Sequence, residues 1–92
     1  MKSAYELAME KLDREQGQSK PVSEDQKKRI AEVDSRLKAK IAEIEILEDP
    51  KIAAAKMGGD MDAVHILQEE KNRDIAKARD RAETEKNEIR AE

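Results

Sequence analysis

The chain has 92 residues and a formal net charge of −3, and 45% of its residues are charged, against roughly 25% in an average globular protein. It has no cysteine, tryptophan or phenylalanine and a single tyrosine, which excludes disulfides, thiol catalysis and cysteine-bound zinc. No apolar run approaches the ~20 residues of a membrane-spanning helix. We therefore expect one small, cytoplasmic, all-α domain that depends on a thin apolar seam or on association.

A short amphipathic helix is predicted over residues 1–16. Ser3 and Glu6 have the spacing of a capping box, in which the serine hydroxyl accepts a hydrogen bond from the third amide of the helix. Residues 17–22 are predicted to be a linker, because Pro21 biases the residue before it away from the helical conformation. The apolar stripe of this helix consists of Tyr5, Ala8, Met9 and Leu12.

A long antiparallel helical hairpin, or coiled coil, is predicted over the rest of the chain, with arms at residues 23–57 and 61–92 and a turn at residues 58–60. Ser23 and Gln26 form a second capping box at the start of the first arm. The turn holds two glycines and an aspartate. A glycine supplies the left-handed residue that ends a helix, and the aspartate caps the next helix.

The two arms have matching apolar residues when they are aligned about the turn. In each matched pair the residue numbers add up to 119. The pairs are Ile30/Ile89, Leu37/Ala82, Ile41/Ala78, Ile44/Ile75, Ile52/Leu67 and Ala55/Val64. Pro50 costs about 3 kcal/mol inside an ideal helix. We therefore expect either a kink near residue 50 or two abutting helices that keep one direction.

The predicted seam is weak for two helices alone. The stripe of the first arm is Ile30, Val33, Leu37, Ile41, Ile44 and Leu47. The second arm contributes alanines and three polar residues to its stripe: Gln68, Lys71, Ala78, Ala82 and Glu85. We expect a homodimer in which two hairpins form a four-helix bundle. The alternative is that the N-terminal helix folds over its own hairpin.

Polar residues of the seam and its flanks have two interpretations each. Lys71 and Gln68 could mark a groove for a partner, or Lys71 could extend to Glu48 and fix the register. We favour the second interpretation. Two basic clusters, residues 27–29 and residues 77–81, are interleaved with acids and have no aromatic neighbours for base stacking. They therefore predict a salt-bridged surface, and nucleic acid is not an expected partner.

His65 is the only histidine of the chain. Asp62 lies three residues before it, which is the spacing of carboxylate-bridged di-iron bundles, and Glu69 lies one turn further on. The residues that face this motif are Met57 and Ala54, which cannot bind a metal. These three candidate ligands could therefore act only in a dimer. We expect a surface histidine and no cofactor.

The hairpin tip combines acidic and methionine side chains: Met57, Asp60, Met61 and Asp62. These residues could form an interaction head. Alternatively, the acids only cap the second arm while the methionines close the end of the seam.

Residues at the tip carry two resemblances to known families. Ala55, the Gly59-Asp60 pair and Leu67 resemble the UVR-type helical hairpin, which implies docking to another protein. The same Gly59-Asp60 turn on a long hairpin resembles the finger of Gre-type transcript-cleavage factors. That resemblance implies that Asp60 and Asp62 enter the polymerase secondary channel and hold a metal. The opening residues 1–8 are similar to uncharacterised small bacterial helical proteins.

The sequence contains no phosphate-binding glycine loop and no nucleophile with a neighbouring base, so we expect no enzymatic activity. The predicted function is a non-enzymatic interaction or assembly module. Its stripe of Tyr5, Met9 and Leu12 would bind a protein partner or a second copy of the chain by helix-in-groove packing. A polymerase-channel regulator and a metal-binding bundle are the alternatives, and no membrane partner is expected.

Overall fold

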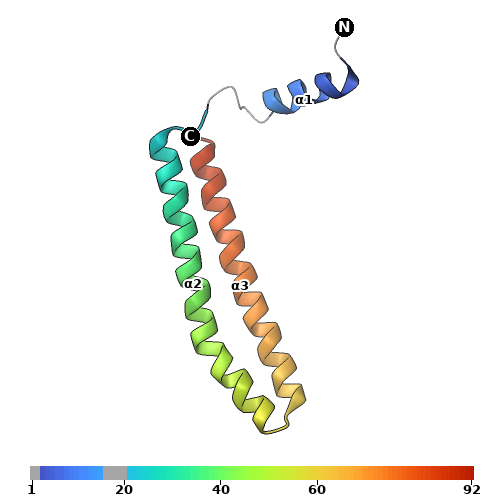
Figure 1. The fold of residues 1–92 in the computed structure, drawn as a ribbon, viewed down its shortest axis with the longest axis vertical. Coiled ribbons are helices and arrows are strands. Elements are labelled where there is room, and N and C mark those ends of the chain that lie inside the picture. The colour runs from blue at the N-terminus through green and yellow to red at the C-terminus, as the bar shows by residue number, and fades with distance from the viewer. Residues whose placement is uncertain (1–2, 16–20) are drawn as a thin grey trace.

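The computed structural model of the chain is an all-α helical hairpin with a short helix before it. The backbone is described for residues 3–15 and 21–92, and the side chains for residues 3–9 and 21–92. Helix α1 covers Ala4–Glu15, α2 covers Glu24–Met57 and α3 covers Met61–Arg90. Helices α2 and α3 run side by side in opposite directions, and α1 lies beyond the open end of the hairpin (Figure 1). The predicted fold class is confirmed.

The molecule is long and thin. Its principal extents are 67 × 33 × 13 Å and its radius of gyration is 20.4 Å, whereas a compact chain of this length would have about 12 Å. The smallest extent is close to the diameter of one helix with its side chains, about 10–12 Å. The hairpin is therefore a single layer of two helices, and both faces of that layer are open.

The start of α2 is fixed by the predicted capping box. The Gln26 amide donates to the Ser23 hydroxyl at 3.1 Å, and the Ser23 amide donates to Oε1 of Gln26 at 2.8 Å. The side-chain amide of Gln26 also donates to the carbonyl oxygen of Ile89 at 2.8 Å. This cap is therefore also a bond between the two arms, which the sequence did not predict.

The turn between the arms is a Schellman motif followed directly by an N-cap. Gly59 has φ +72°, and its amide donates to the Lys56 carbonyl at 3.1 Å. The Asp60 amide donates to the Ala55 carbonyl at 3.0 Å, which completes the motif. The Asp60 carboxylate then accepts from the Ala63 amide at 3.1 Å. The predicted turn is confirmed, and Asp60 both ends α2 and begins α3.

The core is a line of buried apolar side chains along the seam. Its members are Val33, Ile44, Ile52, Val64, Ala82 and Ile89. Near the open end, Val33, Ala82 and Ile89 form one cluster, against which Ile30 and Leu37 pack. The predicted seam therefore exists, but it gathers into a cluster in only one half of the hairpin.

The predicted end of the first-arm stripe is wrong. Leu47 is 58% exposed, whereas the side chain of Glu48 is only 14% exposed. A helix of 3.6 residues per turn advances 100° per residue. Glu48 therefore lies 40° from Ile44 around the axis, and Leu47 lies 60° away on the other side. Because the seam drifts toward Ile52, Leu47 rotates out to the surface.

Helix α2 is continuous through Pro50, so the alternative of two abutting helices is wrong. Figure 1 shows that α2 curves toward its C-terminal end. Proline has no amide hydrogen to donate to the carbonyl four residues earlier, which is that of Ile46. Ile46 is 73% exposed, so water can reach this part of the helix.

Candidate interaction surfaces

Polar contacts across the hairpin confirm the predicted register. Five pairs join α2 or its flank to α3 or its flank: Gln26–Ile89, Arg29–Glu92, Asp34–Lys86, Arg36–Glu85 and Asp49–Lys71. Their residue numbers add up to between 115 and 121, on either side of the predicted 119. Such contacts lie on the flanks of the seam, so their sums are expected to differ from 119 by a few residues in either direction.

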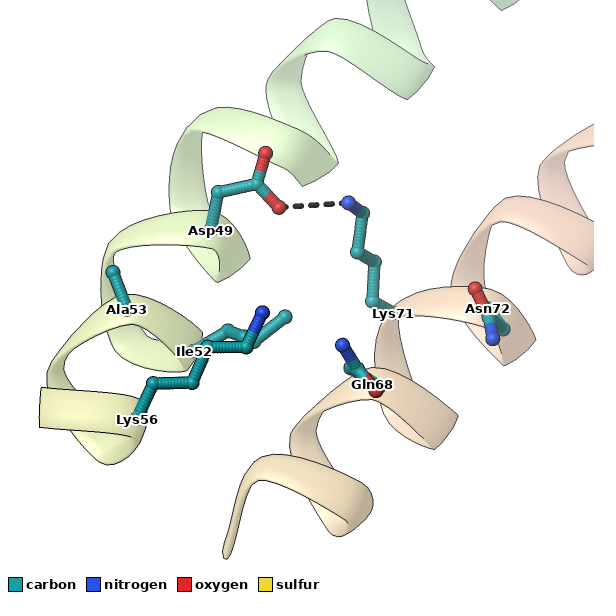
Figure 2. Close-up of a pocket in the computed structure, with 7 residues that line it drawn as sticks. All are labelled: Asp49, Ile52, Ala53, Lys56, Gln68, Lys71 and Asn72. Atoms are coloured by element: carbon teal, nitrogen blue, oxygen red, sulfur yellow. Dashed lines mark hydrogen bonds and ion pairs between the residues drawn. The ribbon is translucent and has the colours of Figure 1, made fainter. Parts of the chain in front are cut away.

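Lys71 bonds to Asp49 and not to Glu48, so its predicted partner is wrong by one residue. Its ammonium donates to Oδ1 of Asp49 at 2.7 Å (Figure 2). This hydrogen bond raises the pKa of Lys71 above its ordinary value, and partial burial opposes the rise. The same helical drift that exposes Leu47 turns Glu48 inward and leaves Asp49 on the flank that Lys71 can reach.

Glu48 is left as a largely buried side chain in the seam, 14% exposed. Its Oε1 lies 3.6 Å from the Lys51 ammonium, and its Oε2 is buried without a hydrogen-bond partner among the described residues. A buried acceptor of this kind costs about 1–3 kcal/mol when it is unpaired. The seam is therefore locally destabilised next to Ile44.

Ion pairs support the open end of the hairpin. Both terminal guanidinium nitrogens of Arg29 donate to the two carboxylate oxygens of Glu92, and this bidentate bond lowers the pKa of Glu92. Lys86 lies 3.0 Å from Asp34 and 3.3 Å from Glu83. These hydrogen bonds raise the pKa of Lys86.

One groove of the hairpin lies beside the Lys71–Asp49 pair. It has a volume of ≈ 500 Å³ and is lined by Asp49, Ile52, Ala53, Lys56, Gln68, Lys71 and Asn72. Figure 2 shows Lys71 extending toward Asp49 across the gap between the helices. Its ammonium is therefore already paired, and Gln68 beside it is exposed. Lys71 and Gln68 thus line one groove, as the interpretation of these residues as a partner-binding groove required.

A second groove, which we call the alanine groove, lies elsewhere along the seam. It consists of two adjoining hollows of ≈ 350 and ≈ 210 Å³ that share Lys40, Ala78 and Arg81. Its lining is Val33, Arg36, Leu37, Lys40, Ile44, Leu47 and Glu48 from α2, and Asp74, Lys77, Ala78, Arg81, Ala82 and Glu85 from α3. The sequence indicated that Ala78 and Ala82 make a weak seam and permit close approach of further helices, but it did not predict a hollow between the arms.

The predicted partner-binding stripe lies on α1. Tyr5 is 73% exposed and Met9 is 45% exposed, and the side chain of Leu12 lies outside the described residues. Within the described part of the chain, α1 contacts neither α2 nor α3. The alternative in which α1 covers its own hairpin is therefore not the arrangement seen here.

The predicted tip residues are exposed. Met57 is 91% exposed and Met61 is 63% exposed, so these methionines do not close the seam, contrary to one interpretation. The Asp60 carboxylate is occupied as the cap of α3. Asp62 lies in the first turn of α3, and its side chain is exposed.

The structure brings together two of the three candidate metal ligands. Nε2 of His65 lies 3.0 Å from Oε1 of Glu69, and the two side chains are 75% and 59% exposed. Within the described residues, no three histidine, cysteine, aspartate or glutamate side chains gather closely enough to hold a metal ion. His65 and Glu69 therefore form a surface pair on one helix.

Fold and surfaces together define an all-α helical hairpin with an appended amphipathic helix. Comparisons of the chain with protein families, curated proteins and solved structures find no match. Among the described residues, none of the helices combines the length and the apolar character needed to cross a bilayer.

Proposed function

We propose that this chain is a non-enzymatic, cytoplasmic interaction or assembly module that associates through the exposed apolar face of α1. The observation that carries the proposal is that α1 is a formed helix and that the described residues of its apolar stripe do not pack against the hairpin. Tyr5 and Met9 are largely exposed, and no described part of the hairpin contacts α1.

Helix energetics support this proposal. An isolated helix of 12 residues is marginal in water even for favourable sequences, and α1 has 12 residues. Full burial of a methionine or leucine side chain contributes about 1.5–3 kcal/mol. Association through the stripe would therefore stabilise α1 as well as the complex. Stabilisation of a marginal helix by the binding of its apolar face is typical of helix-in-groove recognition.

The shape of the hairpin supports a helical partner. A single layer 13 Å thick leaves the alanine groove open along one face. Two such layers, or one layer and an added helix, would bury apolar surface that one hairpin leaves exposed. The proposed partner is a protein helix, and a second copy of this chain is the partner we favour, as a homodimer.

A charge placed on the stripe tests this function. Leu12→Glu should shift the wild-type dimer to the monomer mass in light scattering coupled to size exclusion, and it should abolish capture of a partner. Leu7→Glu is the matched control. Leu7 lies on the other face of the same helix, so the dimer should persist. If Leu12→Glu left both the mass and the capture unchanged, the proposal would be wrong.

A regulator of the polymerase secondary channel is a second candidate. It is favoured by a narrow hairpin whose tip carries Asp60 and the exposed Asp62. The variant Asp60→Asn/Asp62→Asn tests it, because asparagine still caps a helix and helicity should stay unchanged. Altered transcription in a purified system would support this candidate, and unaltered transcription would remove it.

A metal-binding bundle is a third candidate, and the 3.0 Å His65–Glu69 pair is the feature that favours it. Calorimetry with Fe²⁺ and Zn²⁺ tests it directly. Binding that His65→Ala abolishes would support a metal site, and the absence of binding to the wild type would exclude it.

A further inference from the structure

We propose that two copies of this chain exchange their α1 helices, each of which lies in the alanine groove of the other hairpin. This inference rests on the proposed function, because it names the surface that receives the α1 stripe. The floor of the groove supplies an apolar surface for such a helix. Leu47 is 58% exposed and Leu37 and Ala78 are half-buried, so these three side chains offer the apolar surface, whereas Val33 and Ala82 beneath them are already buried in the hairpin. Because alanine side chains are short, a third helix can approach closely at this level, within the 8–10 Å interaxial distances of packed helices.

The walls of the groove carry four bases and three acids, Glu48, Asp74 and Glu85, so their net charge is +1. Lys40 and Arg36 stand on α2, and Lys77 and Arg81 stand on α3. Arg36 is already bonded to Glu85 at 2.8 Å. Among the described residues, neither Lys77 nor Arg81 has an ion-pair partner. The α3 wall, which also carries Asp74 and Glu85, therefore has two exposed cations that can pair with acidic groups of a docked helix.

The charge of α1 is complementary to these walls. The helix carries four acids, Glu6, Glu10, Asp13 and Glu15, against two bases, Lys11 and Arg14, so its net charge is −2. An acidic helix with an apolar stripe matches a groove that has half-buried apolar residues and two cations, Lys77 and Arg81, without ion-pair partners among the described residues. Charge complementarity of this kind selects a partner and accelerates encounter more than it adds affinity.

The lengths also agree. A helix of 12 residues is about 18 Å long, and the groove extends along α2 from Val33 to Glu48, a rise of about 23 Å. The eight residues from Gln16 to Ser23 can span at most about 29 Å. A neighbouring hairpin that lies alongside is therefore within reach of α1.

A second copy is favoured over closure within one chain for two reasons. Figure 1 shows α1 beyond the open end of its own hairpin, and the described residues of α1 touch neither α2 nor α3. In addition, reciprocal exchange uses two helices and two grooves. It therefore buries twice the area of a single docking, which brings the contact closer to the 1,200–2,000 Å² of stable interfaces.

Charge reversal on the groove wall is the first test. Lys77→Glu/Arg81→Glu should weaken the dimer at least tenfold in analytical ultracentrifugation, with helicity unchanged by circular dichroism. The control is Arg73→Glu/Arg79→Glu, which reverses two exposed cations of the same helix that do not line the groove. Equal weakening by both variants, or by neither, would overturn the inference.

Spin labelling separates exchange from closure within one chain. Because the chain has no cysteine, Leu7→Cys carries the only nitroxide, on the face of α1 away from the stripe. Labelled chains are mixed with ¹⁵N-labelled wild type. Exchange predicts broadening of the amide signals of Leu37, Ala78 and Ala82 in the ¹⁵N chain.

Each alternative result has a defined meaning. Broadening only when the nitroxide and ¹⁵N are on one chain would show docking within a chain and overturn exchange. A dimer that Leu12→Glu disrupts but that shows no broadening at the groove would overturn this inference and leave the proposed function standing. Insensitivity of the mass to Leu12→Glu would instead overturn the proposed function.

Discussion

The two halves of the hairpin share one geometry and differ in chemistry. At the open end, Val33, Ala82 and Ile89 form an apolar cluster, and four cross-hairpin polar contacts flank it. Toward the tip, Ile52 and Val64 are buried without a comparable cluster, and one cross-hairpin ion pair joins the arms there, that of Lys71 with Asp49.

This difference shows that register and stability are separate properties. The tip half keeps the register because the turn is only three residues long and is fixed by backbone hydrogen bonds. Its buried apolar residues form no comparable cluster, and the polar side chains of Glu48 and Lys71 lie along this part of the hairpin. The open end is far from the turn along the chain, yet it supplies most of the packing. Packing therefore fixes one end of the hairpin and turn geometry fixes the other.

Truncation of a buried isoleucine in each half should give the largest difference in stability between the two halves. Ile89 and Ile52 are 5% and 7% exposed, so they are matched in burial. Ile89→Ala should lower the free energy of unfolding by about 3 kcal/mol, as is usual for a packed core. Ile52→Ala should cost about 1–2 kcal/mol, because its surroundings are polar and can hydrate. Urea denaturation followed by circular dichroism measures both, and equal losses would contradict the comparison.

The turn should show the next largest effect. Gly59 has φ +72°, so Gly59→Ala should cost about 1–2 kcal/mol from backbone strain alone. Gly58 is helical, and an added Cβ would lie 3.5 Å from the Ala54 carbonyl, an ordinary contact. Gly58→Ala should therefore be neutral or slightly stabilising. Amide exchange should show that Gly59→Ala loosens the tip half first, and uniform loosening would argue against two distinct halves.

Removal of the Glu48 carboxylate should stabilise the tip half. Because Oε2 of Glu48 is buried without a partner, Glu48→Leu should raise the free energy of unfolding by about 1 kcal/mol. Glu45→Leu is the control, because Glu45 is exposed on the same helix and its replacement should be close to neutral. A loss of stability in Glu48→Leu would show that the ion pair of Glu48 with Lys51 outweighs the cost of the unbonded Oε2.

The smallest effect is the response to pH. The bond from Arg29 lowers the folded-state pKa of Glu92 below 4.5, so its contribution is present above pH 4.5 and is lost as the pH falls further. The stability of Glu92→Gln should therefore differ from that of the wild type at pH 7 and converge with it near pH 3.

The raised pKa values of Lys71 and Lys86 act in the opposite direction. Their contributions are present below pH 10.5 and are lost above it. Thermal melts at several pH values measure both, and salt should weaken both.

Local signals in the sequence predicted the fold well. Ser23 and Gln26 form the predicted box, and Gly59 adopts the predicted left-handed conformation. The capping box and the turn conformation depend on residues close together in the chain, so the local sequence is enough to predict them. The register follows from the short turn, which leaves the arms little freedom to slide.

Features that depend on helix rotation were predicted less well. Leu47 is exposed, and Lys71 reaches Asp49 instead of Glu48. Both errors arise because a stripe read in steps of three and four cannot say on which side of the axis the seam drifts. The alanine groove was missed for a related reason, because a hollow depends on how far two helices stand apart. Sequence periodicity contains no such distance.

The short turn and the apolar cluster at the open end together determine which part of the hairpin can open first. Closing a chain loop of 63 residues, as the Gln26–Ile89 bond does, costs only about 0.9 kcal/mol more entropy than closing the 22 residues between Asp49 and Lys71, because the cost grows with the logarithm of length. The free energy gained by packing of the apolar cluster of Val33, Ala82 and Ile89 exceeds this entropic difference. The hairpin therefore does not have to zip from its turn, and its middle can separate as a bubble while both ends remain closed.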